Sequence, residues 1–363
     1  MKRRDFLTGA AAVGVTACSR QSEGTRTDCS AEQRFEWKMV TTWPQNFPGL
    51  GTGAANLARL IGEASGGRLT VKLYGAGELV PAFEVFDAVS RRTADMGHGA
   101  PYYWKGKAEA AQFFAATPFG MNAQERNAWI YYGGGNELWR EVYAPFGLIP
   151  AAAGNSGIQM GGWFNKEING LADLQGLKMR IPGLGGEVLR RAGGTPINMP
   201  GSEIFTALQT GSIDATEWVG PYNDLAFGLY QAARYYYYPG WHEPGSTLEA
   251  LINKESFDAL PDDLQVIVMM ACETVNGNML AEYTARNQAA LDQLVNEHGV
   301  DLRPFPDEVL IRMKAISAEV LEELAEKDPL VRKVFDSQQA FLATVSRWHD
   351  ISEVAYYRAR ELE

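Results

Sequence analysis

The chain contains few of the residues from which disulfide frameworks and clustered metal sites are built. Its 363 residues include three cysteines and four histidines, and no two cysteines have the CxxC spacing of zinc or redox motifs. Cys272 lies in the apolar run VIVMMACETV, where a buried and unreactive thiol is expected. Cys29 lies in a polar stretch, and the sequence leaves a Cys29–Cys272 disulfide open without favouring it.

Basic charge and long hydrophobic runs are also scarce. Lysine and arginine number 33 against 44 aspartates and glutamates, which gives a net charge of −11. This balance argues against nucleic acid as a partner, because phosphate contacts need clustered basic side chains. No apolar run approaches the roughly 18 residues of a membrane-spanning helix, and there is neither a low-complexity tract nor a repeat of fixed period. A chain of this length is expected to form two domains.

The N-terminus has the pattern of an export signal and not of a folded element. Residues 1–17, MKRRDFLTGAAAVGVTA, combine a basic start with a short run of small apolar residues. The RRDFL segment resembles a twin-arginine signal, and VTAC, which ends at Cys18, resembles a lipoprotein cleavage box. Cys18 then either carries a lipid or is incidental, and residues 18–33 are expected to form a flexible tether.

From residue 34 onward, strand and helix patterns alternate, which predicts an α/β fold with largely parallel sheets. FEWKMVTTW alternates in polarity and ends at Trp43. GAANLARLIGEASGG has apolar residues at helical spacing and stops at a double glycine, and RLTVKLYGAGEL reads as a strand. A helix then precedes the aromatic segment PYYW, which contains Tyr102 and Tyr103. A second block of the same kind begins near residue 151.

The second block places polar side chains in its predicted strands or at their ends. IPAAAGNSGIQMGGWFN reads as a strand that contains Gln159. In LKMRI the apolar side chains share one face, so Arg180 projects from the other. SIDATEW reads as a strand with Glu217 and Trp218 at its carboxyl end, and a further strand follows Glu243.

The remainder of the chain is predicted to be mostly helical. Ser202 is expected to cap the helix EIFTALQTG, and apolar residues recur at helical spacing in residues 262–297 and 307–324. After Pro329, one helix of about 30 residues would be about 45 Å long. Because that exceeds the width of a small domain, this helix either braces both domains or packs against a second subunit.

Motifs typical of enzymes are missing or incomplete. GLGGEV lacks the third glycine of a dinucleotide-binding loop, and no P-loop occurs. HEPGS begins like a zinc-protease helix at His242, but Pro244 breaks the helix and no second histidine follows. No serine lies in a GxSxG elbow, and Glu217 and Glu243 carry no glycosidase signature. We therefore expect no catalytic residues.

A binding site is easier to build, because open parallel sheets bind ligands at the carboxyl ends of their strands. Arg180 can form two parallel hydrogen bonds with a carboxylate; the alternative is a surface arginine paired with an aspartate. Glu217 and Glu243 would repel an anionic ligand unless a cation lay between them, and oxygen ligands suit Na⁺ or Ca²⁺; the alternative is two solvated acids. Aromatic residues would wall off a small apolar body or simply belong to the core. The candidate ligand-binding residues are Trp43, Tyr102, Tyr103, Gln159, Arg180, Glu217 and Trp218.

Several long segments match a known family. The stretches WKMVTTWPQNFPGLGTGA, GLKMRIPGLGG and YYPGWHEPGSTLEALIN resemble the extracytoplasmic solute receptors of TRAP transporters, the DctP-type periplasmic substrate-binding proteins. LKMRIPG, followed by GGTP and EIFTALQTGSIDATE, is highly specific for that family. EWVGPYND and GWHEPG are similar to the branch that binds 2-oxo acids and lactate with a metal ion. The resemblance covers nearly the whole mature chain.

The resemblance implies a role for each candidate residue. The arginine of the MRIPG strand, here Arg180, would grip the substrate carboxylate. Na⁺ or Ca²⁺ would be held by Gln159, Glu217, the carbonyl of Trp218 and Glu243. Other branches carry a second basic residue near the position of Gln159, so sialic-acid-like ligands and metal-free dicarboxylates are not expected. The implied substrate is a short 2-oxo or 2-hydroxy monocarboxylate, such as pyruvate or 2-oxobutyrate.

The resemblance also implies a two-lobe periplasmic binding protein fold with mixed, mostly parallel sheets and hinge-crossing strands. Residues 34–157 with roughly 245–285 would form one lobe, and residues 158–244 with roughly 286–328 the other. Residues 329–363 would form a long helix that is swapped between the subunits of a homodimer. A small and a large membrane subunit would accept the ligand in the periplasm. Two other functions stay open: a receptor for lactate or another organic acid that serves sensing, and a soluble enzyme that acts on 2-oxo acids.

Overall fold

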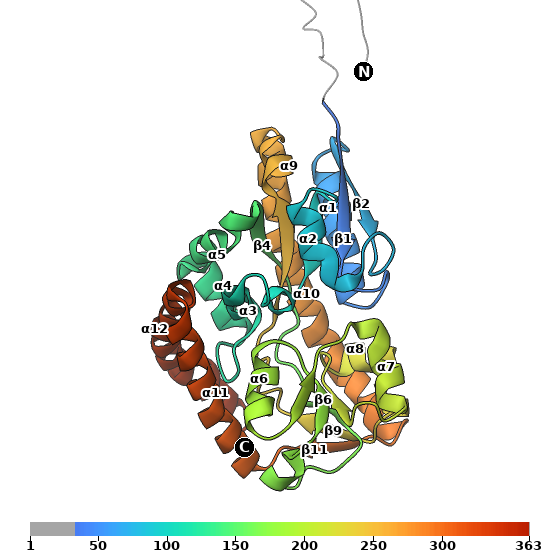
Figure 1. Cartoon of the computed structure of the whole chain (residues 1–363), viewed down its shortest axis with the longest axis vertical. Coiled ribbons are helices and arrows are strands. Elements are labelled where there is room, and N and C mark those ends of the chain that lie inside the picture. Colours follow the sequence, from blue (N-terminus) through green and yellow to red (C-terminus); the bar gives the residue numbers. More distant parts are fainter. Residues whose placement is uncertain (1–32, 363) are drawn as a thin grey trace, which may run out of the picture. The chain divides into compact units, whose positions relative to one another are not determined.

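Two β-sheets with helices around them make up the described part of the chain, residues 33–362 of a computed structural model (Figure 1). The predicted export signal, Cys18 and Cys29 lie outside the described residues. Cys272 is buried, as expected, and is a free cysteine. The disulfide that the sequence left open involves Cys29 and therefore also lies outside the described residues.

The first sheet has the strand order β2-β1-β3-β10-β4. Its first three strands are parallel, whereas β10 is antiparallel to both of its neighbours, β3 and β4. Alternate side chains of β1, such as Trp37 and Met39, are buried in the core, which is the pattern that FEWKMVT predicts. The strands are β1 (Phe35–Thr41), β2 (Leu69–Tyr74), β3 (Met96–Gly99), β4 (Leu148–Asn155) and β10 (Thr247–Asn253).

The second sheet has the strand order β11-β9-β5-β8-β6-β7. Parallel pairs join β6 to β7 and β8, and β9 to β11, whereas β5 is antiparallel to β8 and β9. Most of these strands are short, so the sheet depends on the aromatic packing of residues such as Trp163 and Tyr236, whose ring centroids are 4.1 Å apart. The strands are β5 (Gly162–Phe164), β6 (Lys178–Arg180), β7 (Thr195–Ile197), β8 (Ala215–Thr216), β9 (Tyr235–Tyr238) and β11 (Asp301–Pro304).

Two connecting segments cross between the sheets and lie side by side. Residues 156–161 lead from β4 to β5, and residues 239–246 lead from β9 back to β10. Backbone hydrogen bonds join them: Gln159 N donates to Glu243 O (3.1 Å), and Gly240 N donates to Gln159 O (2.9 Å). We call residues 156–161 and 239–246 the crossing segments. The predicted α/β fold with two mixed sheets and crossing connections is confirmed.

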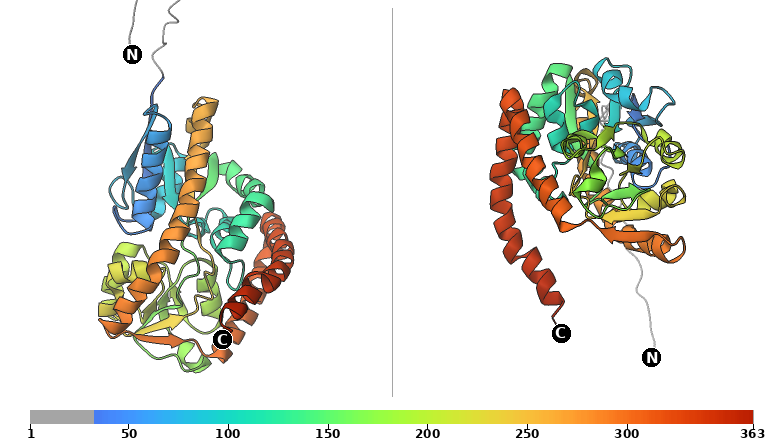
Figure 2. Two further views of the ribbon diagram at one scale, coloured as in Figure 1. Left: turned by 180° about the vertical axis from the view of Figure 1, so that it is seen from behind. Right: turned by 60° about the horizontal axis from the view of Figure 1, so that its bottom comes forward.

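Helices cover the two sheets and fill the connections between strands (Figures 1 and 2). They are α1 (Leu50–Ala64), α2 (Val85–Ser90), α3 (Gln112–Ala115), α4 (Ala123–Tyr132), α5 (Gly135–Tyr143), α6 (Gly183–Arg191), α7 (Gly201–Gln209), α8 (Pro221–Phe227), α9 (Lys254–Asp258), α10 (Asp262–Asn296), α11 (Asp307–Lys327), α12 (Pro329–Ile351) and α13 (Glu353–Arg360). A short 3₁₀ turn, η2, spans Pro101–Trp104. Within residues 33–362, none of the helices is both long and apolar enough to cross a membrane.

α10 is one continuous helix that packs against β4 of the first sheet and against α8, which belongs to the second block. The left view of Figure 2, from the back, shows α10 running in front of both sheets. The lobe boundary that we place near residue 285 therefore falls inside a single helix. The assignment of residues to two lobes stays a prediction, although the strands divide between the two sheets at the crossing segments.

Three local predictions are wrong. Gln159 does not lie in a strand: β4 ends at Asn155, whose side chain accepts from Gly157 N (2.8 Å), and β5 starts only at Gly162. Ser202 does not cap α7, because the helix already begins at Gly201 after Pro200, and no side chain caps it. The last helix is not continuous, because Ser352 adopts φ −104° and ψ −91° and separates α12 from α13.

Candidate functional site

The ends of β6 and β8 bring a cation and an anion together. These strands are parallel neighbours with Arg180 opposite Thr216, so Arg180 and the residue after Thr216, Glu217, emerge at the same edge. Glu217 N donates to Arg180 O at 3.2 Å, which continues the strand pairing by one step. Arg180 ends β6, and Glu217 and Trp218 follow the end of β8, as predicted.

Arg180 is buried, with 1% of its side chain exposed, and one side of its guanidinium is committed to Glu217. Nη1 donates both to the Glu217 backbone oxygen (3.1 Å) and to Glu217 Oε1. The other donors make only long contacts, Nη2 to Tyr103 Oη and Nε to Met199 O, each 3.4 Å. The guanidinium carbon lies 5.2 Å from the Trp218 ring centroid, a cation–π distance. The alternative of a surface arginine paired with an aspartate is wrong.

Burial and charge act in opposite directions on Arg180. Burial is the largest single influence and lowers the pKa of Arg180, but Glu217, the two tyrosines and Glu243 together outweigh it, and the net pKa of Arg180 is raised. Arg180 is therefore charged at any physiological pH.

The crossing segments contribute an amide and a second buried carboxylate. Gln159 Nε2 donates to Glu243 Oε2 (2.8 Å) and to Ser156 Oγ (3.0 Å), and Ser246 Oγ donates to the same Glu243 oxygen. Burial, reinforced by the charge of Glu217, raises the pKa of Glu243 above its ordinary value. Neither Glu217 nor Glu243 is exposed by more than 4%, so the alternative of two solvated surface acids is wrong.

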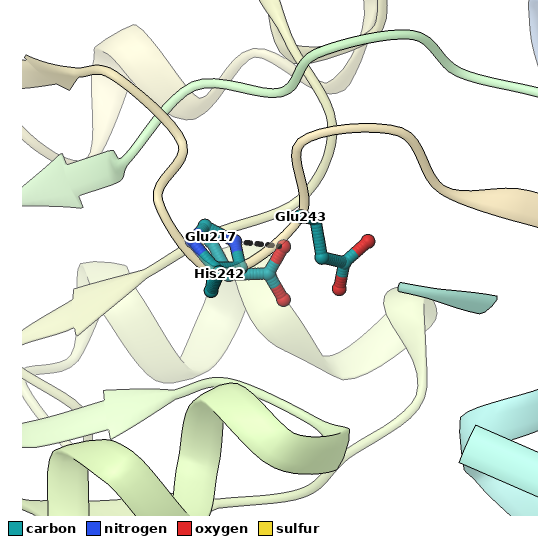
Figure 3. A group of neighbouring side chains, drawn as sticks. All are labelled: Glu217, His242 and Glu243. Carbon is teal, nitrogen blue, oxygen red and sulfur yellow. Dashed lines mark ion pairs between the residues drawn. The ribbon is translucent and has the colours of Figure 1, made fainter. Parts of the chain in front are cut away.

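Several buried polar atoms of this cluster have no hydrogen-bond partner among the described residues. They include Gln159 Oε1, Glu217 Oε2 and both ring nitrogens of His242. His242 Nε2 lies 3.4 Å from Glu217 Oε2, and ligand atoms of Glu217, His242 and Glu243 all lie within 4.8 Å of one another. Figure 3 shows the Glu217 carboxylate between the imidazole of His242 and the carboxylate of Glu243.

These unpartnered oxygens fit a hard metal ion. A buried acceptor without a donor costs free energy, and two carboxylates held this close repel each other unless a cation or a proton lies near them. Gln159 Oε1, Glu217 Oε2 and a Glu243 oxygen together form an oxygen-rich donor set of the kind that Ca²⁺ and Na⁺ prefer. The carbonyl of Trp218 as a further ligand stays a prediction.

A small cavity lies between this cluster and the first sheet. Six of the candidate residues line it, and Glu217 lies directly behind Arg180. The lining residues are Trp43, Leu50, Tyr102, Tyr103, Ser156, Gln159, Arg180, Trp218, Val219 and Leu248.

The aromatic side of the cavity is fixed by the first sheet. Trp43 follows β1, and its Nε1 donates to Nδ1 of His98 on β3 (2.9 Å); the other ring nitrogen of His98 lies 3.0 Å from Ala153 O. Burial lowers the pKa of His98 to about 4, so this histidine is neutral near pH 7. Trp43 packs against Tyr103 and Trp218 at centroid distances of 6.1 and 6.3 Å. Trp43 thus faces residues of both sheets.

The sequence analysis missed His242 and four lining residues. His242 was considered only as part of a helical zinc motif, and its position next to Glu243 is the signal that could have placed it in the site. No sequence signal identifies the other four, because their places depend on how the two sheets face each other. They are Leu50, Ser156, Val219 and Leu248.

Comparison with known proteins identifies the family. The model of the bacterial extracellular solute-binding proteins, family 7 (DctP), matches residues 39–328. The chain belongs to the DctP family. This is a family of TRAP-transport solute-binding proteins and not of enzymes, and its extracellular place agrees with the export signal that the sequence predicts.

Individual members of the DctP family match the chain over nearly its full length. The monocarboxylate 2-oxoacid-binding periplasmic protein of Nostoc sp. (strain PCC 7120) is 42% identical over 360 residues, which is 98% of each chain. A TRAP periplasmic solute-binding protein from Colwellia psychrerythraea, solved with calcium and pyruvate, is 41% identical with a TM-score of 0.88, over 90% of this chain and 100% of that one.

Two further DctP-family structures extend this picture. The protein from Pseudoalteromonas atlantica T6c, solved with sodium and pyruvate, is 42% identical with a TM-score of 0.88, over 91% of this chain and 100% of that one. The Bordetella bronchiseptica RB50 protein is a mixed-occupancy dimer with calcium and picolinate in one site. It is 36% identical with a TM-score of 0.89, over 90% of this chain and 97% of that one.

Proposed function

We propose that this protein is the receptor of a TRAP transporter that captures a 2-oxo monocarboxylate, such as pyruvate or 2-oxobutyrate, together with Na⁺ or Ca²⁺. A single observation carries the proposal. A buried arginine and a set of unpartnered buried oxygens meet at one small cavity. Relatives with 41–42% identity were solved with bound pyruvate and bound calcium or sodium, and the Nostoc relative is named for binding 2-oxo acids.

Arg180 is the proposed binding partner of the ligand carboxylate. Nη2 of Arg180 lies at the cavity and makes only one long contact, to Tyr103 Oη at 3.4 Å. An incoming carboxylate can replace that contact with a charge-assisted hydrogen bond, which is roughly twice as strong as a neutral one. Because Trp218 covers the guanidinium, the ligand is confined to the plane of the donors.

The oxygen cluster accounts for the cation. Arg180 contributes one positive charge, and Glu217 and Glu243 contribute two negative ones, so the site cannot hold a further anion without added positive charge. A cation held by Gln159, Glu217 and Glu243 would supply that charge. Gln159 and Glu243 lie on the two crossing segments, so they hold their oxygens where the two sheets are joined.

The remaining lining residues account for the size of the ligand. Leu50, Leu248 and Val219 are buried apolar side chains at the cavity, and they offer no polar partner for a second charged group. A short aliphatic tail fits against them, and a dicarboxylate would leave one carboxylate unpaired and buried. We therefore place the specificity at 2-oxo acids with a short apolar tail, and 2-hydroxy acids such as lactate are the closest alternatives.

Isothermal titration calorimetry with pyruvate and 2-oxobutyrate, each with and without added Na⁺ or Ca²⁺, tests the proposed function. We expect binding that requires one of the two ions. Mass spectrometry of small molecules carried through purification would identify the natural acid. Absence of binding under every ion condition, or turnover of the acid, would overturn the proposal. Transport and sensing are separated by asking whether the protein restores uptake when it is expressed with TRAP membrane subunits.

We further propose that the C-terminal helices mediate a homodimer. None of the α13 side chains is buried, and a helix of 8 residues is not stable in water without packing. Its exposed apolar residues, with those at the end of α12, are Trp348, Ile351, Val354, Tyr356 and Tyr357. Figure 2 shows α13 leading away from the sheets. The Bordetella bronchiseptica protein was solved as a dimer.

Light scattering on the full chain and on one truncated variant tests this assembly. A stop codon in place of Ser352 removes α13, and we expect a monomer where the full chain gives a dimer. A dimer that persists after truncation would contradict the role of α13. Attachment of a lipid at Cys18 belongs to the same set of proposals and is tested by the mass of the mature protein purified from membranes.

A further inference from the structure

We infer that residues 44–50 form a strap that Asn223 fastens across the cavity, and that this fastening determines how slowly a bound acid is released. The inference rests on the proposed function and adds to it a positioning residue that does not line the cavity. The strap, PQNFPGL, links β1 to α1. Trp43 directly precedes it and Leu50 is its last residue, and both line the cavity. A contact that holds the strap therefore also holds two lining residues in place.

The strap contacts a helix of the second block. α8 follows β8 of the second sheet and carries Asn223, whose side chain is buried. Asn223 Nδ2 donates a hydrogen bond to the backbone oxygen of Pro48 at 2.8 Å. This hydrogen bond joins the two sides of the cavity, because Pro48 lies on the side of the first sheet.

Tyr283 of α10 holds Asn223 in the orientation that this hydrogen bond needs. Its Oη donates to Asn223 Oδ1 at 2.7 Å, which leaves the amide nitrogen free to donate to Pro48. The next residue of the strap, Gly49, has φ +68°, and a Cβ atom there would lie 2.4 Å from Tyr283 Oη. The strap therefore approaches Tyr283 more closely than a residue with a side chain would allow, and Asn223 forms its two hydrogen bonds at this contact.

An aromatic contact adds to the fastening. The ring centroid of Phe47 lies 6.1 Å from that of Trp218 and 5.4 Å from that of Phe227, both in edge-to-face geometry. Such pairs stabilise a contact beyond the apolar area that they bury. Within the strap, Leu50 N donates to Pro48 O at 2.7 Å. Movement of Pro48 away from α8 would therefore also move Leu50 away from the cavity.

These contacts join parts of the chain that must separate when a solute enters or leaves. The residues that line the cavity are buried, apart from the half-buried Tyr103. A solute can therefore pass only when the two sides of the cavity move apart, and this movement breaks the Asn223–Pro48 hydrogen bond and the contacts of Phe47. Interactions that exist only in the closed form slow dissociation and do not speed association. The strap should therefore act on the rate of release, whichever acid is natural.

Stopped-flow tryptophan fluorescence of pyruvate binding, at saturating Ca²⁺ and separately at saturating Na⁺, tests the inference, because Trp43 and Trp218 line the cavity. For Asn223→Ala we expect pyruvate to dissociate about 2- to 10-fold faster than from wild type, which is the effect of losing one hydrogen bond. We expect association to be no slower than in wild type. An unchanged dissociation rate in folded Asn223→Ala would overturn the inference.

Asn276→Ala is the matched control for Asn223→Ala. Asn276 is also buried, and its Nδ2 donates to Asn127 Oδ1 at 2.9 Å, which joins α10 to α4 and not to the strap. Urea denaturation should show that both variants lose stability, whereas only Asn223→Ala should release pyruvate faster. Equal acceleration in both variants would mean that the rate follows general stability, and this result would also overturn the inference.

Phe47→Ala keeps the inference testable should Asn223→Ala fail to fold, because Phe47 is only half-buried. We expect pyruvate to dissociate about tenfold faster from this variant, since both edge-to-face contacts of the ring are lost. Phe146→Ala is its control: this ring is also half-buried but packs on Phe86 at 5.0 Å, and we expect wild-type rates. Release at the wild-type rate from Phe47→Ala would overturn the inference.

Failure of the proposed function gives a different result from failure of the inference. If the proposed function is wrong, wild type itself binds no acid under any ion condition, and the inference fails with it. If only the inference is wrong, wild type binds pyruvate, and the two strap variants release it no faster than their controls do.

Discussion

The two walls of the cavity differ in whether their buried polar atoms have hydrogen-bond partners within the protein. On the wall from the first sheet, the Trp43 indole donates to His98, and His98 in turn lies within hydrogen-bonding distance of Ala153 O. On the wall from the second sheet and the crossing segments, Glu217 Oε2 and Gln159 Oε1 have no hydrogen-bond partner among the described residues. The polar atoms of Trp43 and His98 on the first wall are paired without a ligand, whereas the unpaired oxygens of the second wall can be paired by a bound ion or acid.

This difference assigns separate tasks to the walls. Groups that are held in place but lack partners gain most from a bound ion or acid, so the charged wall should decide whether binding occurs. A wall whose polar atoms are already satisfied mainly offers shape and apolar surface, so the aromatic wall should decide which acids fit. Substitutions on the two walls should therefore differ in kind and in size.

The largest effect is expected from Arg180→Ala. Removing one partner of a buried, hydrogen-bonded charge pair costs about 2–5 kcal/mol in binding, which is at least about 30-fold in affinity for pyruvate. Glu217 would also be left buried without its partner, at a cost of about 3–5 kcal/mol in the free energy of unfolding. Calorimetry measures the first effect and chemical denaturation the second.

Arg191→Ala is the matched control for Arg180→Ala. Arg191 pairs with Glu187 and Glu323 near the surface, where its side chain is 22% exposed. Such pairs contribute about 0–1 kcal/mol, so we expect unchanged pyruvate binding and a small change in stability. Comparable losses in both variants would mean that the burial of Arg180 has no special importance for the site.

A smaller effect is expected from Gln159→Leu. The substitution removes Oε1, a predicted ligand of the cation, and the Nε2 donor that orients Glu243. An unsatisfied buried acceptor costs about 1–3 kcal/mol, so affinity for Ca²⁺ should fall about tenfold. Gln338→Leu is the control, because Gln338 is also buried but donates only to the backbone oxygen of Phe113 (2.7 Å). Titration of Ca²⁺ into both variants makes the comparison.

A substitution on the aromatic wall should change which 2-oxo acid binds best and should not abolish binding. In Trp43→Phe the cavity becomes larger, so pyruvate should bind somewhat more weakly and 2-oxo acids with longer tails somewhat better. One methylene group in an apolar pocket is worth about 1–3 kcal/mol, which bounds the shift. Trp139 stacks on Phe114 in the core. Trp139→Phe should therefore lower stability without altering the ratio of the affinities for pyruvate and for longer 2-oxo acids. An unchanged ratio in Trp43→Phe would contradict the proposed division of tasks.

The residues at strand ends were the part of the site that was most predictable from sequence. Arg180, Glu217 and Trp218 lie where short strands end, and neighbouring parallel strands bring such ends together whatever the rest of the fold does. Gln159 was placed among the right residues but in the wrong element. Its segment reads as one long strand, and nothing local shows that Asn155 ends β4 by bonding to the following turn.

The other misses have tertiary or steric causes. Leu50 and Leu248 lie on elements far apart in sequence, and only the docking of the two sheets makes them neighbours of one cavity. Pro200, not Ser202, precedes α7, because the fixed φ of proline at −67° already turns the chain into the helix. The break at Ser352 leaves the apolar spacing of the C-terminal helices intact, so periodicity could not reveal it.

The smallest effect on binding is expected at Glu249, a buried acid in the first sheet. Its carboxylate accepts from Trp104 Nε1 and from Tyr143 Oη (3.0 Å), and burial raises the pKa of Glu249 to about 8. The folded protein therefore binds this proton more tightly than the unfolded chain. Its contribution to stability is fully present below the ordinary pKa of glutamate and is lost as the pH rises toward about 8, with a slope of at most about 1.4 kcal/mol per pH unit.

Urea denaturation of Glu249→Gln between pH 5 and 8 tests this assignment. The variant lacks the proton, so its stability should fall less with pH than that of wild type, and the two curves should diverge toward pH 8. Glu36→Gln, at an exposed position of β1, is the control and should follow wild type. Parallel curves for Glu249→Gln and wild type would contradict the raised pKa. Unchanged pyruvate affinity in Glu249→Gln would show that a buried carboxylate matters to the ligand only where it meets Arg180.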